Sequence, residues 1–398
     1  MECSPEKRLN YIEATVGLFH LEVAVLVMLF RGHGGSDKEH GTLSHWIKHL
    51  KRNKNTLWDG QKQLIKDFRA CFDLFGHIVD GYLVGFVAER CGWTNGGLGK
   101  AFEDTIDIQD TIAELAARLA DFKQVETHRQ SAIAARDRLH ENMILFLQQG
   151  LILRNFHNAM AHGDIGRLLI SFRHLTLWFQ ASTQYNYAQE TIHLTACLQR
   201  IWSPEFREFM LQHCLISIMG KPDGFYACDE LNEYVVREVK KMMVHNASPK
   251  TDEHLRETIS PQVMFSMRLK MKVAEESDAT YIFDYHHQEV DTSAEVEAVA
   301  LDSLRRKVFK HIPGRSDSIK KEVPDLLMAG LKELCTTERL TNYKRRVAAM
   351  GIRGVVELQR KSRNGVEEEG EEQDEDDIQI EKESLIGGME DDEDAWLD

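Results

Sequence analysis

The segment from residue 16 to residue 35, VGLFHLEVAVLVMLFRGHGG, is the most apolar stretch of the chain. A helix that spans a membrane needs about 20 consecutive apolar residues. Here the uninterrupted apolar run covers Val23–Phe30, after His20 and Glu22 and before Arg31. Because this run is too short to cross a membrane, we predict a buried core helix that ends in the glycine-rich loop following it.

Helical periodicity continues through most of the chain. Apolar residues recur at three- and four-residue steps, which is the spacing of one helix face. One such series, in a helix expected from residue 59 to residue 92, is Leu64, Phe68, Phe72, Phe75 and Val79. Residues 219–230, MGKPDGFYACDE, form the clearest turn region, and proline is scarce, with 7 residues. The predicted fold class is therefore mainly α, a multi-helix, bundle-like globular domain with at most a few short strands.

The net charge of −15 is distributed unevenly along the chain. Residues 366–398 contain 17 acidic residues and one lysine, whereas residues 301–365 contain 16 Lys or Arg and 7 Asp or Glu. A tail this acidic cannot bury enough apolar surface to fold, so we predict that it is disordered. The predicted organisation is a helical core over residues 1–315, a basic helical extension over 316–365 and the acidic tail over 366–398.

The basic segment at 301–365 is the feature that most directly suggests a partner. Its charge suits contacts with nucleic-acid phosphates, while the acidic tail is an alternative, internal partner for the same charge. The seven cysteines are widely spaced and form no CxxC pair, which favours free thiols over a disulfide framework or a zinc module. Without a recognisable secretory signal, we expect an intracellular protein, nuclear or cytoplasmic, with no membrane partner.

Four histidines lie close together in the sequence: His33, His40, His45 and His49. His45 and His49 are one helical turn apart, and two such imidazoles can ligate one metal ion. However, the HEXXH spacing is absent and no nearby cysteine completes a ligand set. We interpret these residues as surface histidines in a polar loop and helix, and we expect no cofactor.

Two short stretches contain carboxylates that could support chemistry. In HGDIGR, Gly163 can end one helix, Asp164 can cap the next, and Arg167 can pair with Asp164. In CDELNEYVVREVKK, Asp229 and Glu233 lie one helical turn apart and could hold a divalent ion, as in two-metal nucleases. The alternative for the second pair is an acidic first turn that balances the helix dipole.

Three blocks of the sequence together resemble an uncharacterised, mostly fungal family, the domain of unknown function 6589. The blocks are RLNYIEATVGLFHLEVAVLVMLFRGHGG, FHNAMAHGDIGRLLISFRHLTLWFQASTQYNYAQETIHL and GKPDGFYACDELNEYVVREVKK. The matching positions are His20 in the first block, then Gly163, Asp164, Arg167, Asn186, Tyr187 and Glu190, and finally Asp229, Glu233 and Lys240.

The resemblance implies an origin in mobile elements and a nuclease-like ancestry, without an established reaction. In the third block, Tyr234 and Val236 stand where the family usually has His and Asn. Family members generally carry a long region ahead of the first block, so the resemblance also implies an N-terminally truncated copy.

These observations lead to three functional hypotheses. The first is a non-catalytic helical protein, a binding protein or a relic of a mobile-element protein. The second is a metal-dependent nuclease or transposase-like enzyme that uses Asp164, Asp229 and Glu233 around a divalent metal. The third is association with nucleic acid through residues 301–365.

Overall fold

The structure is a computed structural model, and it describes residues 15–59, 64–90, 108–182, 184–217, 220, 222–233, 236–237, 253, 292–315 and 319–349. The structural statements below refer to these residues. The predicted acidic tail and Lys240 lie outside them, as do residues 350–365 of the basic segment.

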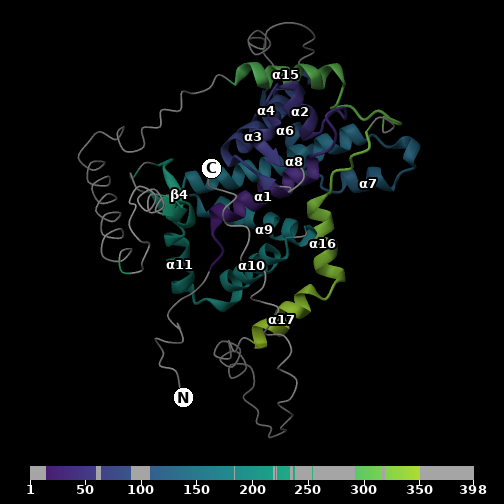
Figure 1. Cartoon of the computed structure of the whole chain (residues 1–398). Helices are drawn as coiled ribbons and strands as arrows, with labels where there is room; N and C mark the ends of the chain where they lie inside the picture. Colours follow the sequence, from purple (N-terminus) through teal and green to yellow (C-terminus); the bar gives the residue numbers. More distant parts are fainter. Residues whose placement is uncertain are drawn as a thin grey trace, which may run out of the picture.

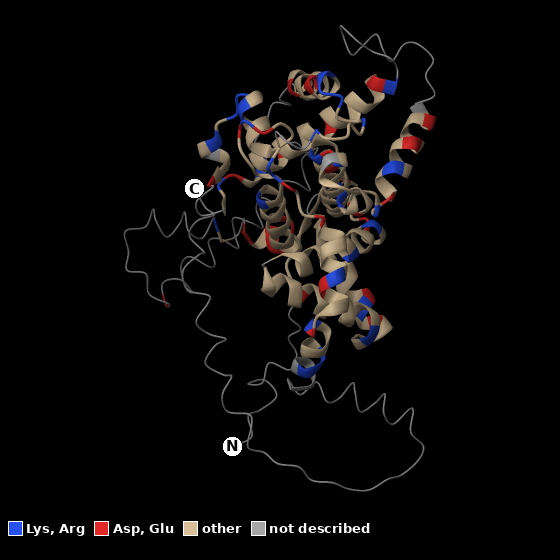
Figure 2. Cartoon of the chain, turned by 90° about the vertical axis from the view of Figure 1, so that its right-hand side faces the viewer, with Lys and Arg blue, Asp and Glu red and all other residues tan. Residues whose placement is uncertain are grey.

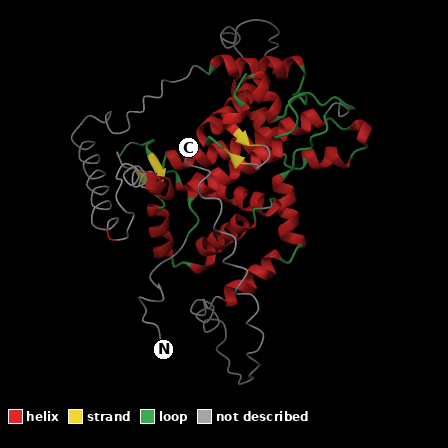
Figure 3. Cartoon of the chain, in the orientation of Figure 1, coloured by secondary structure: helices red, strands yellow, loops and turns green. Residues whose placement is uncertain are grey.

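Helices dominate the described part of the chain, which confirms the predicted fold class (Figures 1 and 3). The helices are α1 (Leu18–His33), α2 (Leu43–His49), α3 (Lys54–Leu57), α4 (Phe68–Arg90), α6 (Ile108–Ala120), α7 (Gln124–Gln130), α8 (Arg138–Ala161), α9 (Ile165–Ala181), α10 (Tyr185–Ala196), α11 (Pro204–His213), α15 (Ser293–Arg305), α16 (Leu326–Thr336) and α17 (Arg339–Ala349), with a 3-10 turn η1 (Ile133–Ala135) and a π-helical turn η2 (Cys197–Ile201).

Helix α1 is the buried core helix that its sequence predicts. It packs against α8 and α4, and twelve of its residues, Glu22 among them, are buried. Helix α8 is likewise buried on most sides, whereas α9 packs against α8 on one side and against α10 and α16 on others. These helices share one continuous apolar core, because their inward side chains form a single cluster that extends from Leu18 to Leu326.

Two short antiparallel hairpins interrupt the described helices. Strand β1 (Trp58–Asp59) pairs with β2 (Leu64–Ile65), and β3 (Leu215–Ser217) pairs with β4 (Phe225–Ala227). The first hairpin corrects the predicted helix from residue 59, because α4 begins at Phe68, after β2 has paired its backbone with β1. Of the turn region predicted over residues 219–230, residues 222–223 form a turn, but the prediction is wrong for Phe225–Ala227, which form strand β4 because they pair with β3.

Residues 306–315 and 319–325 lie along α8 and are held there by buried polar groups; we call these two described stretches the strap. Asp137, which is fully buried, accepts hydrogen bonds from the Ile312 amide at 2.7 Å and from the Arg315 guanidinium at 2.6 and 2.9 Å. Residues 311–315, HIPGR, are therefore attached to the core. Their order comes from a carboxylate that lies far away in the sequence.

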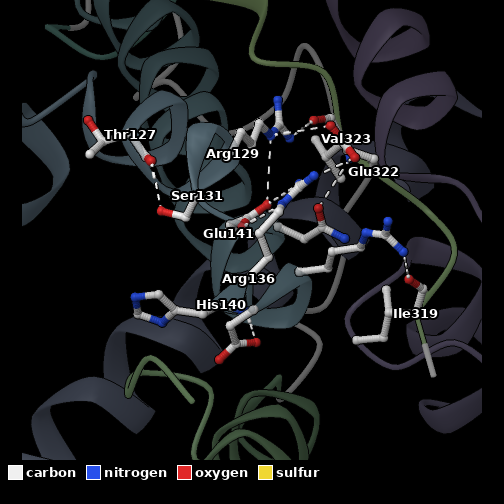
Figure 4. Close-up of polar contacts among 12 residues, drawn as sticks. Thr127, Arg129, Ser131, Arg136, His140, Glu141, Ile319, Glu322 and Val323 are labelled. Carbon is white, nitrogen blue, oxygen red and sulfur yellow. Dashed lines mark hydrogen bonds and ion pairs between the residues drawn. The ribbon is translucent and has the colours of Figure 1, made fainter. Parts of the chain in front are cut away.

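A second network holds the later part of the strap (Figure 4). Glu141 is fully buried and accepts two hydrogen bonds from the Arg136 guanidinium, at 2.7 and 3.2 Å. Arg136 and Arg129 also form ion pairs with Glu322, at 3.3 and 3.5 Å. Arg129 donates to the carbonyl oxygen of Val323 at 2.5 Å. The predicted extension from residue 316 thus contacts the helical core directly.

The described parts of the basic segment, residues 301–315 and 319–349, reach both ends of the helical body. Helix α15 lies at one end of the helical body and α17 at the other end, with the core between them (Figure 1). Figure 2 shows Lys and Arg positions near both ends. Any contact with nucleic acid therefore has to be assigned to one of the two ends.

The prediction of surface histidines is wrong for His33 and His45. His33 is 1% exposed, and its Nε2 atom lies 2.8 Å from Oε1 of Gln149. Burial lowers the pKa of His33 to about 4, so its imidazole is neutral at physiological pH. His45 is 8% exposed, in contact with α15. The prediction failed because polar residues surround these histidines in the sequence, a pattern that indicates exposure. Helices that are distant in the sequence pack over both rings and bury them.

One described helix, α4, is long and apolar enough to cross a membrane by length and composition. In this structure α4 is a core helix. It packs against α8 and α15, and α15 comes so close that Val299 and Ala300 lie next to the α4 glycines 81 and 85.

Candidate functional site

The N-terminus of α1 meets the segment that follows strand β4. Asp229 lies immediately beyond this strand, and its two oxygens accept hydrogen bonds from the amides of Phe19, at 3.2 Å, and His20, at 3.0 Å. Gly17 occupies the N-cap position of α1 and has no side chain that could accept these bonds. Asp229 therefore caps α1 from a distant part of the sequence, and its charge stabilises the positive end of the helix dipole.

The His20 side chain completes this contact. Its Nδ1 atom lies 2.9 Å from Oδ2 of Asp229, and its Nε2 atom lies 3.5 Å from Oε1 of Glu233. Gly17 makes the approach possible, because a β-carbon at this position would overlap the Asp229 carboxylate. The first family block and the third are thus joined through one imidazole.

The ionisation of these groups follows from their contacts. The hydrogen bond that His20 donates to Asp229 raises the pKa of His20 against the opposing effect of burial, and the charges of Asp229 and Glu233 add to the increase. Burial favours the neutral form of Asp229, but the hydrogen bonds from His20 and the Phe19 amide outweigh it and lower the pKa of the carboxyl group. The pair therefore favours an imidazolium next to a carboxylate.

A second pair lies beside the first. Glu22, 2% exposed on the buried side of α1, accepts a hydrogen bond from Nδ1 of His157 on α8 at 2.8 Å. Burial raises the pKa of Glu22, although the His157 contact opposes the increase. Glu230, the neighbour of Asp229, has its pKa raised to about 7 by burial and by the charge of Glu22. We call the six residues the carboxylate–histidine cluster: His20, Glu22, His157, Asp229, Glu230 and Glu233.

The central family block borders the same region. Gly163 ends α8 with a φ of +64°, and the ring of Phe225 on β4 lies against its Cα, where a β-carbon would come within 2.9 Å of the ring. Tyr187 of α10 stacks on Phe179 at 5.3 Å. Burial raises the pKa of the Tyr187 hydroxyl, and the charge of Asp229 contributes to the increase.

Asp164 has the structural role that the sequence predicts for it. Its Oδ1 atom accepts the Arg167 amide at 3.0 Å at the start of α9, and its Oδ2 atom accepts Nε of Arg167 at 2.8 Å. Asn186 and Glu190 are exposed on α10. Within the described residues, none of Asp164, Asp229 and Glu233 belongs to a group of three ligand-type side chains close enough to share an ion.

The sequence analysis missed three members of the cluster: Glu22, His157 and Glu230. Glu22 was visible as a carboxylate within the most apolar helix, and a buried carboxylate requires a partner. That rule indicates that a partner exists but not which residue it is. His157 and Glu230 gave no signal of their own, because each lies among ordinary helical residues.

The described residues define a mainly helical protein in which separate sequence blocks converge on a carboxylate–histidine cluster. Residues 2–286 match the family of unknown function DUF6589. Since the match covers well over half of the chain, the protein belongs to this family. No curated protein and no solved structure matches the chain. Helices α15, α16 and α17 lie beyond the matched residues.

Proposed function

We propose that this protein acts by binding, without catalysis, and that its ligand is single-stranded nucleic acid held by α17 and the adjoining face of α10. The proposal places the protein inside the cell, in the nucleus or cytoplasm, and suits a copy derived from a mobile-element protein. The observation that carries it is a polar and aromatic pocket at the base of a basic helix.

Helix α17 contains four basic residues, Arg339, Lys344, Arg345 and Arg346, and no acidic residue. Lys344 and Arg345 are exposed. The helix is fixed at its start, where Arg339 donates to the carbonyl oxygen of Gln180 at 2.7 Å. A basic helix anchored in this way presents its charges at defined positions, as contacts with phosphates require.

A pocket of about 160 Å³ lies between α10 and α17. Its polar and aromatic lining consists of Gln180, Tyr185, Gln189, Arg339, Asn342 and Tyr343. Ligand pockets for whole metabolites measure about 300–1,000 Å³. The smaller volume here suits a single ring system, such as one nucleobase of a longer strand.

Tyr185 provides the stacking surface that such a base requires. The side chain is 58% exposed, and the Arg339 guanidinium lies 5.6 Å from its ring centroid. Stacking on an exposed aromatic ring contributes about 1–3 kcal/mol per base. Amide side chains such as Gln189 and Asn342 can donate to and accept from base edges.

The candidate carboxylates support the absence of catalysis. Each oxygen of Asp229 accepts at least one hydrogen bond from the start of α1, and each oxygen of Asp164 accepts one from Arg167. Oxygens that hold helix ends in place are less available to an ion, so the nuclease hypothesis requires these bonds to break.

The test measures binding of a fluorescent single-stranded oligonucleotide to the full chain by anisotropy at several salt concentrations. We expect the double variant Lys344→Ala/Arg345→Ala to reduce the slope of log K against log salt by about 1.4, because each phosphate contact contributes about 0.7. Tyr185→Ala should weaken binding by about 1–3 kcal/mol with little change in slope.

The matched control removes the same charge at the other end of the body, through Arg305→Ala/Lys310→Ala. Both side chains are exposed there. The proposal fails if this control weakens binding as much as the α17 variant does, or if the wild-type chain binds no oligonucleotide at low salt.

A second candidate function, a metal-dependent nuclease, is supported by His20, which is 50% exposed in its side chain between Asp229 and Glu233. An assay with Mg²⁺ and Mn²⁺ on DNA and RNA tests it. Cleavage that Asp229→Asn and Glu233→Gln both abolish, and that Asp164→Asn leaves intact, would establish the enzyme and overturn the non-catalytic proposal.

A further inference from the structure

A separate polar cluster lies where α2 meets α15, at the end of the body opposite α17 (Figure 1). It consists of His40, in the loop before α2, His45, in the first turn of α2, and Asp302 on α15. One ligand atom of each side chain lies within 4.8 Å of the other two, and no other such trio occurs among the described residues.

The contacts among these three side chains are close but are not good hydrogen bonds. Nε2 of His45 lies 3.7 Å from Oδ2 of Asp302, which exceeds the normal range for an N–H···O bond. The rings of His40 and His45 lie 4.6 Å apart at an interplanar angle of 77°. The three groups therefore surround a common point without satisfying one another.

Two buried imidazole nitrogens in this cluster, Nδ1 of His40 and Nε2 of His45, have no hydrogen-bond partner among the described residues. His45 is more than nine-tenths buried, and Asp302 is 3% exposed. Buried polar atoms are normally paired, because leaving them unpaired loses their hydration without a replacement. Two unpaired imidazole nitrogens that lie close to the same buried carboxylate therefore indicate a ligand between them.

We propose that His40, His45 and Asp302 bind a divalent transition-metal ion of the zinc class. Two imidazole nitrogens and one carboxylate oxygen are a ligand set that such ions favour, with water or another donor in the fourth position. A tetrahedral ion with bonds of about 2.1 Å needs its donors about 3.4 Å apart. The His45 and Asp302 atoms are already near that separation, so small side-chain rotations complete the site.

Two arginines compete with the ion: Arg306, and the more exposed Arg305, whose Nη1 atom lies 3.9 Å from Oδ1 of Asp302. Arg306 makes the closer contact. Its Nε atom donates to Oδ2 of Asp302 at 2.8 Å. A carboxylate can bind a metal ion with one oxygen and keep a second hydrogen-bond partner, as is common around metal ligands. The positive charge of Arg306 nevertheless lowers the affinity, which makes this residue a sensitive probe of the site.

The ion would act as a clip between distant parts of the chain. His40 and His45 lie within the residues that match the family, whereas Asp302 lies beyond them. Binding would connect α15 to the loop and helix that follow α1, in addition to the packing of α15 on α4. We therefore expect the ion to be structural.

The experiment treats the full chain with a chelator, removes the chelator and titrates the protein with Co²⁺, followed by competition with Zn²⁺. We expect one equivalent of Co²⁺ to bind with the visible bands of a tetrahedral site and without thiolate charge-transfer bands. Asp302→Asn and His45→Gln should each lower the affinity for Co²⁺ more than about 100-fold. Even the loss of a residue that only hydrogen-bonds to a metal ligand lowers metal affinity about 10–100-fold.

Two further variants keep the result decisive if a ligand variant does not fold. Arg306→Gln removes the competing charge and should raise the affinity, whereas His213→Gln, at an exposed histidine on α11, should leave it unchanged. Circular dichroism in chelator checks the fold of each variant. Failure of the folded wild-type and Arg306→Gln chains to bind Co²⁺, or binding at full strength to Asp302→Asn, overturns the proposal.

Discussion

Substitution of Asp229 tests the arrangement that connects two of the family blocks. Asp229→Ala removes the cap of α1, which consists of the bonds from the amides of Phe19 and His20, and it removes the contact with the His20 ring. The loss of a helix cap costs about 1 kcal/mol. The contact between Asp229 and the His20 ring adds about 0.5–1 kcal/mol, a small value because solvent screens the half-exposed imidazole. We expect the free energy of unfolding to fall by about 1.5–2 kcal/mol.

Asp229→Asn separates the two contributions. Asparagine also caps helices, but its amide has one oxygen where the carboxylate has two. This variant therefore keeps one of the two bonds to the amides of Phe19 and His20 and loses the charge next to His20. We expect it to lower the free energy of unfolding by about 1–1.5 kcal/mol. The difference between the two variants measures the part of the cap that one oxygen still supplies.

The effect of Asp229→Asn depends on pH in a defined direction. The pKa of His20 is raised above its ordinary 6.5, so its contribution is fully present below pH 6.5 and is lost as pH rises through the folded value. The pKa of Asp229 is lowered below 3.8, so its contribution is present above pH 3.8 and is lost as pH falls through the folded value. The difference from the wild type is therefore largest between these two values.

Urea unfolding of the full chain, followed by far-ultraviolet circular dichroism at about pH 5.5 and about pH 8.5, measures both variants. His20→Gln is the control, because Asp229→Asn should have little further pH-dependent effect in its presence. An Asp229→Ala loss below about 0.5 kcal/mol, or an Asp229→Asn loss that is equal at the two pH values, would refute the reasoning.

Three further predictions follow from single contacts. Asp137→Ala should lower the free energy of unfolding by about 3–5 kcal/mol in urea titrations, because it leaves the Arg315 guanidinium without its buried carboxylate; a loss under about 1 kcal/mol would contradict the buried ion pair. Glu22→Gln should move the pKa of His157 from above its ordinary value to below it, because burial then outweighs the remaining contacts. NMR titration of His157 measures this shift, and an unchanged pKa would exclude the Glu22–His157 pair. Deletion of residues 366–398 should increase DNA affinity most at low salt, and equal affinity at all salt concentrations would remove the tail as a competitor.

The sequence by itself determined the helices and many of their ends. The apolar run at residues 16–35 predicted α1, three- and four-residue apolar steps predicted α4, and local capping explains why α9 starts after Asp164 and α16 after Asp325. These features depend on residues a few positions apart, so a sequence window contains all the information that they need. The division of charge between the basic segment and the acidic tail is also a property of composition.

Tertiary structure decided which helix ends and side chains meet. Nothing near α1 in the sequence indicates that its cap is Asp229, and nothing near α2 indicates that His45 faces Asp302. Each pair joins residues that are far apart in the chain, and many topologies are compatible with the same helical pattern. The local pattern defined the helices, whereas the packing of their apolar faces into one core selected the polar partners that meet at its edges.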